Sequence, residues 1–235
     1  MKNDFKNYAV NHLGIPSTTL DSYEKNNIPK NHSISIIEER ESRFSIMNVF
    51  DRLMKDRIIY IGTDIHSHMA NVINAQLLYL NSIDNTDIQI YISSPGGEVN
   101  AGLSIYDNYC LSNSKIITTV NGLAASMGSI LLGGGEQGQR GSTRFSKVML
   151  HQVSSGCRGT IQDIEISYNE SLRLNNELFE LLGEFTNKTS EQVKKDADRD
   201  LWLSSIEALE YGIIDKIYWS KDKVITLDNL HEVKK

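Results

Sequence analysis

Residues 115–135, "KIITTVNGLAASMGSILLGGG", indicate the fold class of this chain. Its first part, "KIITTV", is rich in β-branched residues, which is typical of a buried strand, and "SMGSILL" continues as an apolar helix. Between them, "NGLAAS" consists mostly of small residues. We therefore predict a strand-to-helix turn at which another group approaches the backbone closely.

The same alternation of strand and helix extends on both sides of this turn. Further strands are predicted at "IIYIG" (58–62), "DIQIYISSPGG" (87–97) and "KVMLHQV" (147–153). Helices are predicted over residues 42–57, 67–83, 99–112 and 160–188. Apolar strands separated by single helices indicate parallel pairing with right-handed crossovers, and helices that cover the sheet. The fold class is therefore α/β.

Composition excludes several classes of protein. The chain has 235 residues, 40% of them hydrophobic, and a net charge of −6 with scattered basic residues, which argues against a nucleic-acid binder. Two cysteines are too few for a disulfide framework and suit a reducing cytoplasm. No apolar run approaches the roughly 18 residues of a membrane span. We expect a cytoplasmic protein with a mobile extension over 1–32, one domain over 33–220 and a polar tail over 221–235.

Ser126 stands at the predicted turn and is the first candidate for chemistry. The carboxyl end of a strand is where α/β folds place ligands, and the following helix start offers unpaired N–H groups for a developing oxyanion. Ser126 is therefore a candidate nucleophile. The alternative is an ordinary helix cap in a tightly packed turn.

A serine nucleophile needs a base, and His151 is the best placed of the six histidines. It follows the buried run "KVML", so it leaves a parallel sheet at the same edge as Ser126. A hydrogen-bonded structural histidine is the alternative. His66 and His68 have the spacing of metal ligands, but no third ligand accompanies them, and we expect no metal. Cys157 is more simply read as incidental than as a nucleophile.

The base in turn needs an acceptor that orients its ring. "KKDADRDLWLS" (194–204) offers Asp196, Asp198 and Asp200, of which Asp200 adjoins the apolar "LWL" and is expected to turn inward. A solvated charge run is the alternative. The turn in "SSPGGEV" (93–99) can present backbone N–H groups, as half of an oxyanion hole or as a simple connection.

Four separated motifs carry a family resemblance. "YISSPGGEVNAGLSIYD", "NGLAASMGSILL", "VMLHQ" and "DADRDLWLSSIEALEYGIID" resemble, in order and spacing, the proteolytic subunits of the ATP-dependent Clp protease, over about residues 43–218. The resemblance implies that Ser126 is the nucleophile, His151 the base and Asp200 the residue that orients it. It also implies that the backbone N–H groups of Gly97 and Met127 form the oxyanion hole.

The same resemblance implies an architecture and partners. The expected fold is the superhelix of βαβ units shared by Clp proteases and crotonases, with a protruding handle made of a helix (163–187) and an adjoining strand. Two stacked heptameric rings would enclose the sites of a serine endopeptidase and receive unfolded proteins from a hexameric AAA+ unfoldase such as ClpX or ClpA/ClpC. Asp198 and Arg199 are candidates for contacts between rings. No phosphate-binding loop motif is present, so no cofactor is expected in this chain and ATP belongs to the partner.

The sequence departs from the family pattern in two places, and two alternative functions stay open. The family often has proline where this chain has Val153, and the following "SSGCRG" differs from the usual glycine-rich segment, which leaves cleavage preference open. Residues 1–32 leave open whether and where a propeptide is removed. A crotonase-like acyl-CoA hydratase or lyase could use the two glycine-rich turns without a triad. A noncatalytic ring subunit is disfavoured by the intact Ser, His and Asp set.

Overall fold

The computed structural model describes residues 35–40 and 43–233, so the predicted extension over 1–32 lies outside the described residues. The chain divides into two units, Met1–Arg52 and Leu53–Lys235. In the first unit, β1 (Ser35–Arg40) pairs antiparallel with β2 (Arg43–Asn48). Helix α3 (Val49–Lys55) follows in the chain and contains the boundary between the two units. The helix predicted from residue 42 is wrong over its first part. Within this strand, "RFSI" (43–46) alternates polar and apolar residues, which is the period of a strand.

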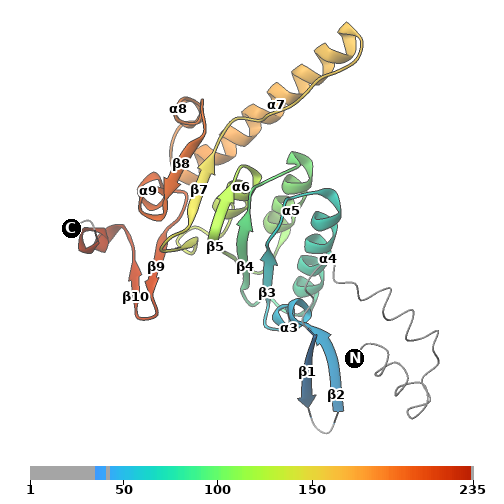
Figure 1. Ribbon diagram of the computed structural model, residues 1–235, viewed down its shortest axis with the longest axis vertical. Helices are drawn as coiled ribbons and strands as arrows, with labels where there is room; N and C mark the ends of the chain where they lie inside the picture. The colour runs from blue at the N-terminus through green and yellow to red at the C-terminus, as the bar shows by residue number, and fades with distance from the viewer. Residues whose placement is uncertain (1–34, 41–42, 234–235) are drawn as a thin grey trace, which may run out of the picture. The chain divides into compact units, whose positions relative to one another are not determined.

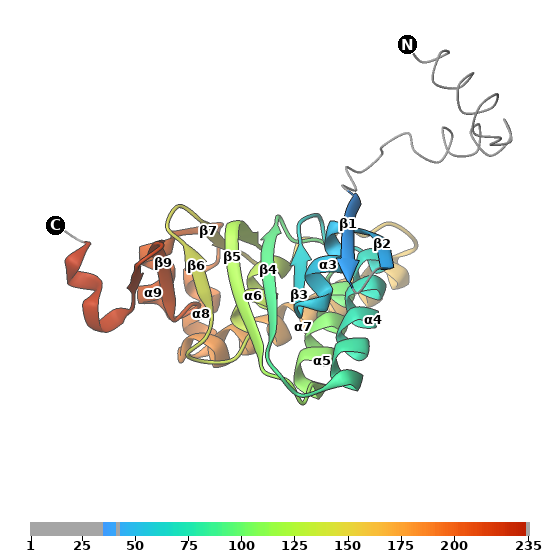
Figure 2. The ribbon, with the colours of Figure 1, turned by 90° about the horizontal axis from the view of Figure 1, so that it is seen from below.

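The second unit is built on one eight-stranded sheet. Its strands are β3 (Ile58–Ile61), β4 (Ile88–Ser94), β5 (Ile116–Ala125), β6 (Gly141–Thr143), β7 (Lys147–Leu150), β8 (Leu201–Ser204), β9 (Lys216–Ser220) and β10 (Lys223–Ile225). The strand order is β10-β9-β6-β5-β4-β3, and β7 pairs with both β5 and β8. Figure 2 shows β9, β6, β5, β4 and β3 side by side. Every pair is parallel except β7 with β8 and β9 with β10, as βαβ order predicts.

Helices pack against this sheet and complete the α/β fold (Figure 1). They are α4 (Ser67–Ile83), α5 (Val99–Leu111), α6 (Met127–Gly133), α7 (Ile161–Thr186), α8 (Ser190–Asp196), α9 (Ser205–Tyr211) and the 3-10 helix η1 (Leu227–Glu232). Along β4, Ile88, Ile90 and Ile92 are fully buried, whereas Gln89 is exposed and Tyr91 half-buried. The apolar face of the strand therefore carries the core. Among the described residues, no helix is long and apolar enough to cross a bilayer.

Helix α7 forms the predicted handle and projects beyond the sheet (Figure 1). A capping box starts it, in which Thr160 and Asp163 exchange hydrogen bonds. The bonds that the Thr160 hydroxyl and backbone N–H donate to the Asp163 carboxylate hold the pKa of that carboxyl below its usual range. Its first ten residues are exposed, whereas Phe179 and Leu182 near its end are buried. Residues 151–160, predicted to begin as a strand and to accompany the handle, form no ladder within the described chain.

The predicted polar tail over 221–235 differs from the structure. Residues 223–225 form β10 against β9, and η1 follows. Ile225 is fully buried and Leu230 is 7% exposed. Two apolar side chains this far apart show no helix or strand period in the sequence, yet each is buried once the neighbouring strand is in place. Residues 221–233 are therefore part of the folded unit.

Candidate active site

Ser126 lies at the junction of β5 and α6, in a backbone conformation that side chains rarely adopt. Its φ is 54° and its ψ is −125°. Its N–H donates to the carbonyl of Met149 at 2.9 Å, and its carbonyl accepts from the N–H of Ser129 at 2.9 Å. A positive φ costs about 1–2 kcal/mol for a residue with a Cβ, so the surrounding bonds must hold this turn in place. Strain of this kind points to function rather than to an ordinary turn.

The Ser126 side chain bonds to His151 and does not cap the helix. Ser126 Oγ lies 2.8 Å from His151 Nε2, and α6 has no side-chain cap bond. The alternative of a simple N-cap is therefore wrong. The strand register explains the contact, because Ala125 of β5 pairs with Met149 of β7 in parallel, so Ser126 and His151 leave the sheet at one edge. The expectation that the two residues meet is confirmed.

Asp200 faces the other nitrogen of the same ring. It precedes β8, whose first residue Leu201 pairs with Leu150 of β7, and this antiparallel pairing sets Asp200 beside His151. The distance from Asp200 Oδ1 to His151 Nδ1 is 3.6 Å, which is an ion-pair separation and longer than a hydrogen bond. The Asp200 side chain is 60% exposed, so it turns toward the histidine but not into the core.

The other two aspartates of this run have different surroundings. Asp196 accepts hydrogen bonds from Gln192 and from the hydroxyl of Tyr211, and burial together with this carboxylate raises the pKa of Tyr211. The carbonyl of Asp198 accepts from the Gln152 side chain at 3.1 Å. Asp198 and its neighbour Arg199 are exposed. Of the three aspartates, Asp200 is the one paired with His151.

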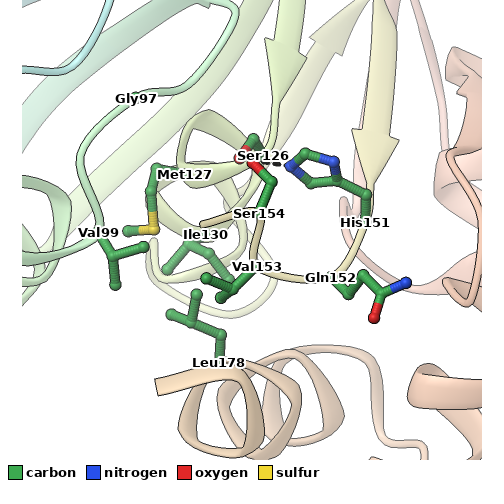
Figure 3. A pocket seen from close by; sticks show the side chains of 10 residues that line it. All are labelled: Gly97, Val99, Ser126, Met127, Ile130, His151, Gln152, Val153, Ser154 and Leu178. Carbon is green, nitrogen blue, oxygen red and sulfur yellow. Dashed lines mark hydrogen bonds between the residues drawn. The ribbon is translucent and has the colours of Figure 1, made fainter. Parts of the chain in front are cut away.

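Two backbone N–H groups near Ser126, those of Gly97 and Met127, indicate an anion site. Met127 is the first residue of α6, where a helix leaves N–H groups unpaired. Gly97 has φ 151°, and a Cβ there would lie 2.0 Å from the carbonyl oxygen of Ile65, so only glycine fits. Within the described part of the chain, neither N–H donates a hydrogen bond to the protein. Figure 3 shows both residues around the pocket that contains Ser126 and His151.

An apolar wall adjoins the serine hydroxyl. The pocket is lined by apolar side chains from four parts of the chain, namely Val99, Met127, Ile130, Val153 and Leu178 (Figure 3). Sequence reasoning did not find Val99, Ile130 or Leu178 as site residues. Ile130 follows Ser126 by one helical turn and was the one detectable from spacing. Leu178 reaches the pocket only because α7 packs across it. The pocket can therefore hold an apolar side chain of a substrate beside Ser126.

The remaining candidates lie outside this arrangement. His66 caps α4, with Nδ1 accepting from the N–H of Met69 at 3.3 Å, and its ring stacks on His68. No cluster of three or more potential metal ligands occurs among residues 35–40 and 43–233. Cys157 is exposed and does not line the pocket.

A hydroxyl bonded to an imidazole, beside free backbone N–H groups, belongs to the class of sites that perform nucleophilic acyl transfer. Residues 39–221 match the family model of the Clp protease. The chain is 48% identical to the ATP-dependent Clp protease proteolytic subunit of Porphyromonas gingivalis, over 92% of this chain and 97% of that protein. It is 43% identical to the subunit of that name in Bacteroides fragilis, over 93% and 99%. The chain belongs to the Clp protease family and is a protease.

Proposed function

We propose that this protein is a serine endopeptidase, the proteolytic subunit of an ATP-dependent Clp protease. The observation that carries the proposal is the 2.8 Å contact between Ser126 Oγ and His151 Nε2 at a strained turn. In this reading His151 Nε2 removes the hydroxyl proton as Ser126 Oγ attacks a peptide carbonyl. The proton then passes to the leaving amine, and water hydrolyses the acyl-enzyme by the same route.

Asp200 and the backbone support the charges that develop in this sequence. The imidazolium forms 3.6 Å from the Asp200 carboxylate, so their attraction stabilises it and holds the ring in one orientation. The N–H groups of Gly97 and Met127 would donate to the oxyanion, and because they are already in place, no reorganisation is needed during the reaction. The chemistry requires no cofactor in this chain. ATP would be used by the partner.

We further propose that the protein is cytoplasmic and assembles into two stacked heptameric rings fed by a hexameric AAA+ unfoldase such as ClpX or ClpA/ClpC. Support comes from the exposed half of α7, where Ile161, Ile166 and Tyr168 are 81%, 67% and 60% exposed. Apolar side chains gathered on a projecting helix favour burial in an assembly. Exposed Asp198 and Arg199 are proposed to contact the opposite ring. Unfolded proteins are the proposed substrates.

Active-site labelling of the purified protein tests the reaction. A fluorophosphonate should label the wild type, and Ser126→Ala should lose both the label and peptide cleavage while its native mass stays unchanged. Ser82→Ala is a control, because it removes an exposed hydroxyl that bonds to the carbonyl of Tyr79 and does not line the pocket, so it should keep the label. Labelling of Ser126→Ala at the wild-type rate, or a pure homo-oligomer without peptidase activity, would refute the proposal.

A further inference from the structure

Asn175, near the middle of α7, bonds to the segment that follows the histidine. Its Oδ1 accepts the backbone N–H of Val153 at 2.8 Å. Asn175 is half-buried, and Val153 lines the pocket beside Ser126, two residues after His151. This bond joins the handle helix to the wall of the site.

A second contact lies one helical turn away on the same face of α7. The hydroxyl of Ser171 donates to that of Ser155 at 3.0 Å. Four residues of helix advance about 6 Å, and two residues of extended chain advance about 6.6 Å. The pairs Asn175 with Val153 and Ser171 with Ser155 therefore match in spacing, and residues 153–155 run antiparallel to α7. Figure 1 shows this segment running alongside the helix.

The opposite edge of the segment faces away from α7. Successive N–H groups of an extended chain point to opposite sides, so those of Gln152 and Ser154 point away from the helix when that of Val153 points toward it. Gln152 and Ser154 both line the pocket. The Gln152 side chain is also held, because it donates to the carbonyl of Asp198 at 3.1 Å. The edge of the segment that faces α7 is therefore occupied by Asn175, and the edge that faces the pocket is the one a peptide could pair with.

We propose that Asn175 is a positioning residue, which acts through Val153 to align the substrate. This inference rests on the proposed peptidase function. By accepting the Val153 N–H it holds residues 152–154 so that their free edge can pair with the backbone of an extended peptide. Valine at this position has an N–H that proline lacks, so this chain needs an acceptor there. An unpaired, partly buried N–H would draw the segment toward water and out of line with the pocket.

Substitution of Asn175 separates substrate positioning from the chemistry at Ser126. Asn175→Leu should raise KM about tenfold for peptides that extend several residues on both sides of the cut, with a smaller change in kcat. The rate at which a fluorophosphonate labels Ser126 should stay within about twofold, because that probe is too small to pair with the segment. Asn175→Asp keeps an acceptor oxygen and should restore the wild-type KM. Asn176→Leu, an exposed neighbour, should change neither quantity.

A double-mutant cycle tests whether Asn175 acts through the Val153 N–H. Val153→Pro removes that donor, so Asn175→Leu should add no further rise in KM in the Val153→Pro background. If Asn175→Leu does not fold, Asn175→Ser, whose side chain is too short to reach Val153, must show the same rise. An unchanged KM, an equal rise in both backgrounds, or labelling that falls as much as kcat/KM would overturn the inference. Labelling of the wild type tests the proposed function separately.

Discussion

Gly96 offers the sharpest test of how the nucleophile is held. It lies in the loop between β4 and α5 with φ 97°, and a Cβ built there would be 2.6 Å from Ser126 Cβ and 2.7 Å from the carbonyl oxygen of Ala125. Ordinary contacts begin at 3.4 Å, so Gly96→Ala must push the turn at Ser126 by about 0.8 Å. The loop and the nucleophile cannot both stay where they are.

A shift of this size has a calculable effect on activity. Moving Ser126 Oγ by about 0.8 Å away from His151 Nε2 lengthens their 2.8 Å contact to about 3.6 Å, beyond hydrogen-bond range. Misplacement by about 1 Å costs on the order of a hundredfold in rate. We therefore expect Gly96→Ala to lower both kcat for a short peptide and the fluorophosphonate labelling rate about a hundredfold, with the native mass unchanged.

Gly138 provides the matched control for this substitution. It has a similar φ of 84°, but a Cβ there meets nothing within 4 Å. Gly138→Ala therefore carries the same backbone strain, about 1–2 kcal/mol of unfolding free energy, without the collision. It should lower the melting temperature and leave labelling unchanged. Wild-type labelling of Gly96→Ala, or an equal loss in both variants, would refute the reasoning.

Three further predictions concern stability and assembly. Arg140 is 3% exposed and bonds to the Asp215 carboxylate at 2.6 and 2.9 Å, so Asp215→Asn should cost about 3 kcal/mol and lower the melting temperature by about 10 °C; an unchanged melting temperature would contradict this. Hydrogen bonds from the Ser204 hydroxyl and backbone N–H hold the pKa of the Glu207 carboxyl below its ordinary value of 4.5. These bonds therefore stabilise the folded protein fully above pH 4.5, and their contribution is lost as the pH falls through the lowered pKa. Ser204→Ala should lower the free energy of unfolding by about 1 kcal/mol at neutral pH, and by less at acid pH, as measured by denaturant melts. A difference between the two proteins that does not change with pH would contradict this prediction. Arg199→Ala should lower peptide cleavage and shift native mass spectra toward single rings, and intact double rings with full activity would exclude that coupling.

Much of the fold was predictable because its signals are local. The strands β3, β4 and β5 are runs of β-branched and apolar residues, and the helices between them follow the 3.6-residue period. The short strands β1, β2, β6, β8, β9 and β10 were missed, since runs of three to six residues have little strand propensity of their own and depend on their neighbours in the sheet. Residues 151–160 form no ladder within the described chain, although the run that ends at Val153 was predicted as a strand.

The core of the site was also predictable, and its surroundings were not. Ser126 and His151 could be placed together because parallel strands end at one edge of a sheet, whatever else the chain does. Asp200 was selected from its apolar neighbours, but only the pairing of β7 with β8 determined that it stops 3.6 Å from the ring. The catalytic roles of these three residues stay predictions.

The βαβ order, the turn at Ser126 and the histidine that would face it could be predicted from the sequence, since each depends on residues close together in the chain or on the polarity of parallel strands. The side chains that line the pocket and the group that accepts the Val153 N–H depend instead on packing between distant parts of the chain. Leu178 and Asn175 reach the site from a helix that begins ten residues after His151, and their positions depend on how α7 packs. Packing of this kind sums many weak contacts between distant residues, and no local pattern in the sequence records it.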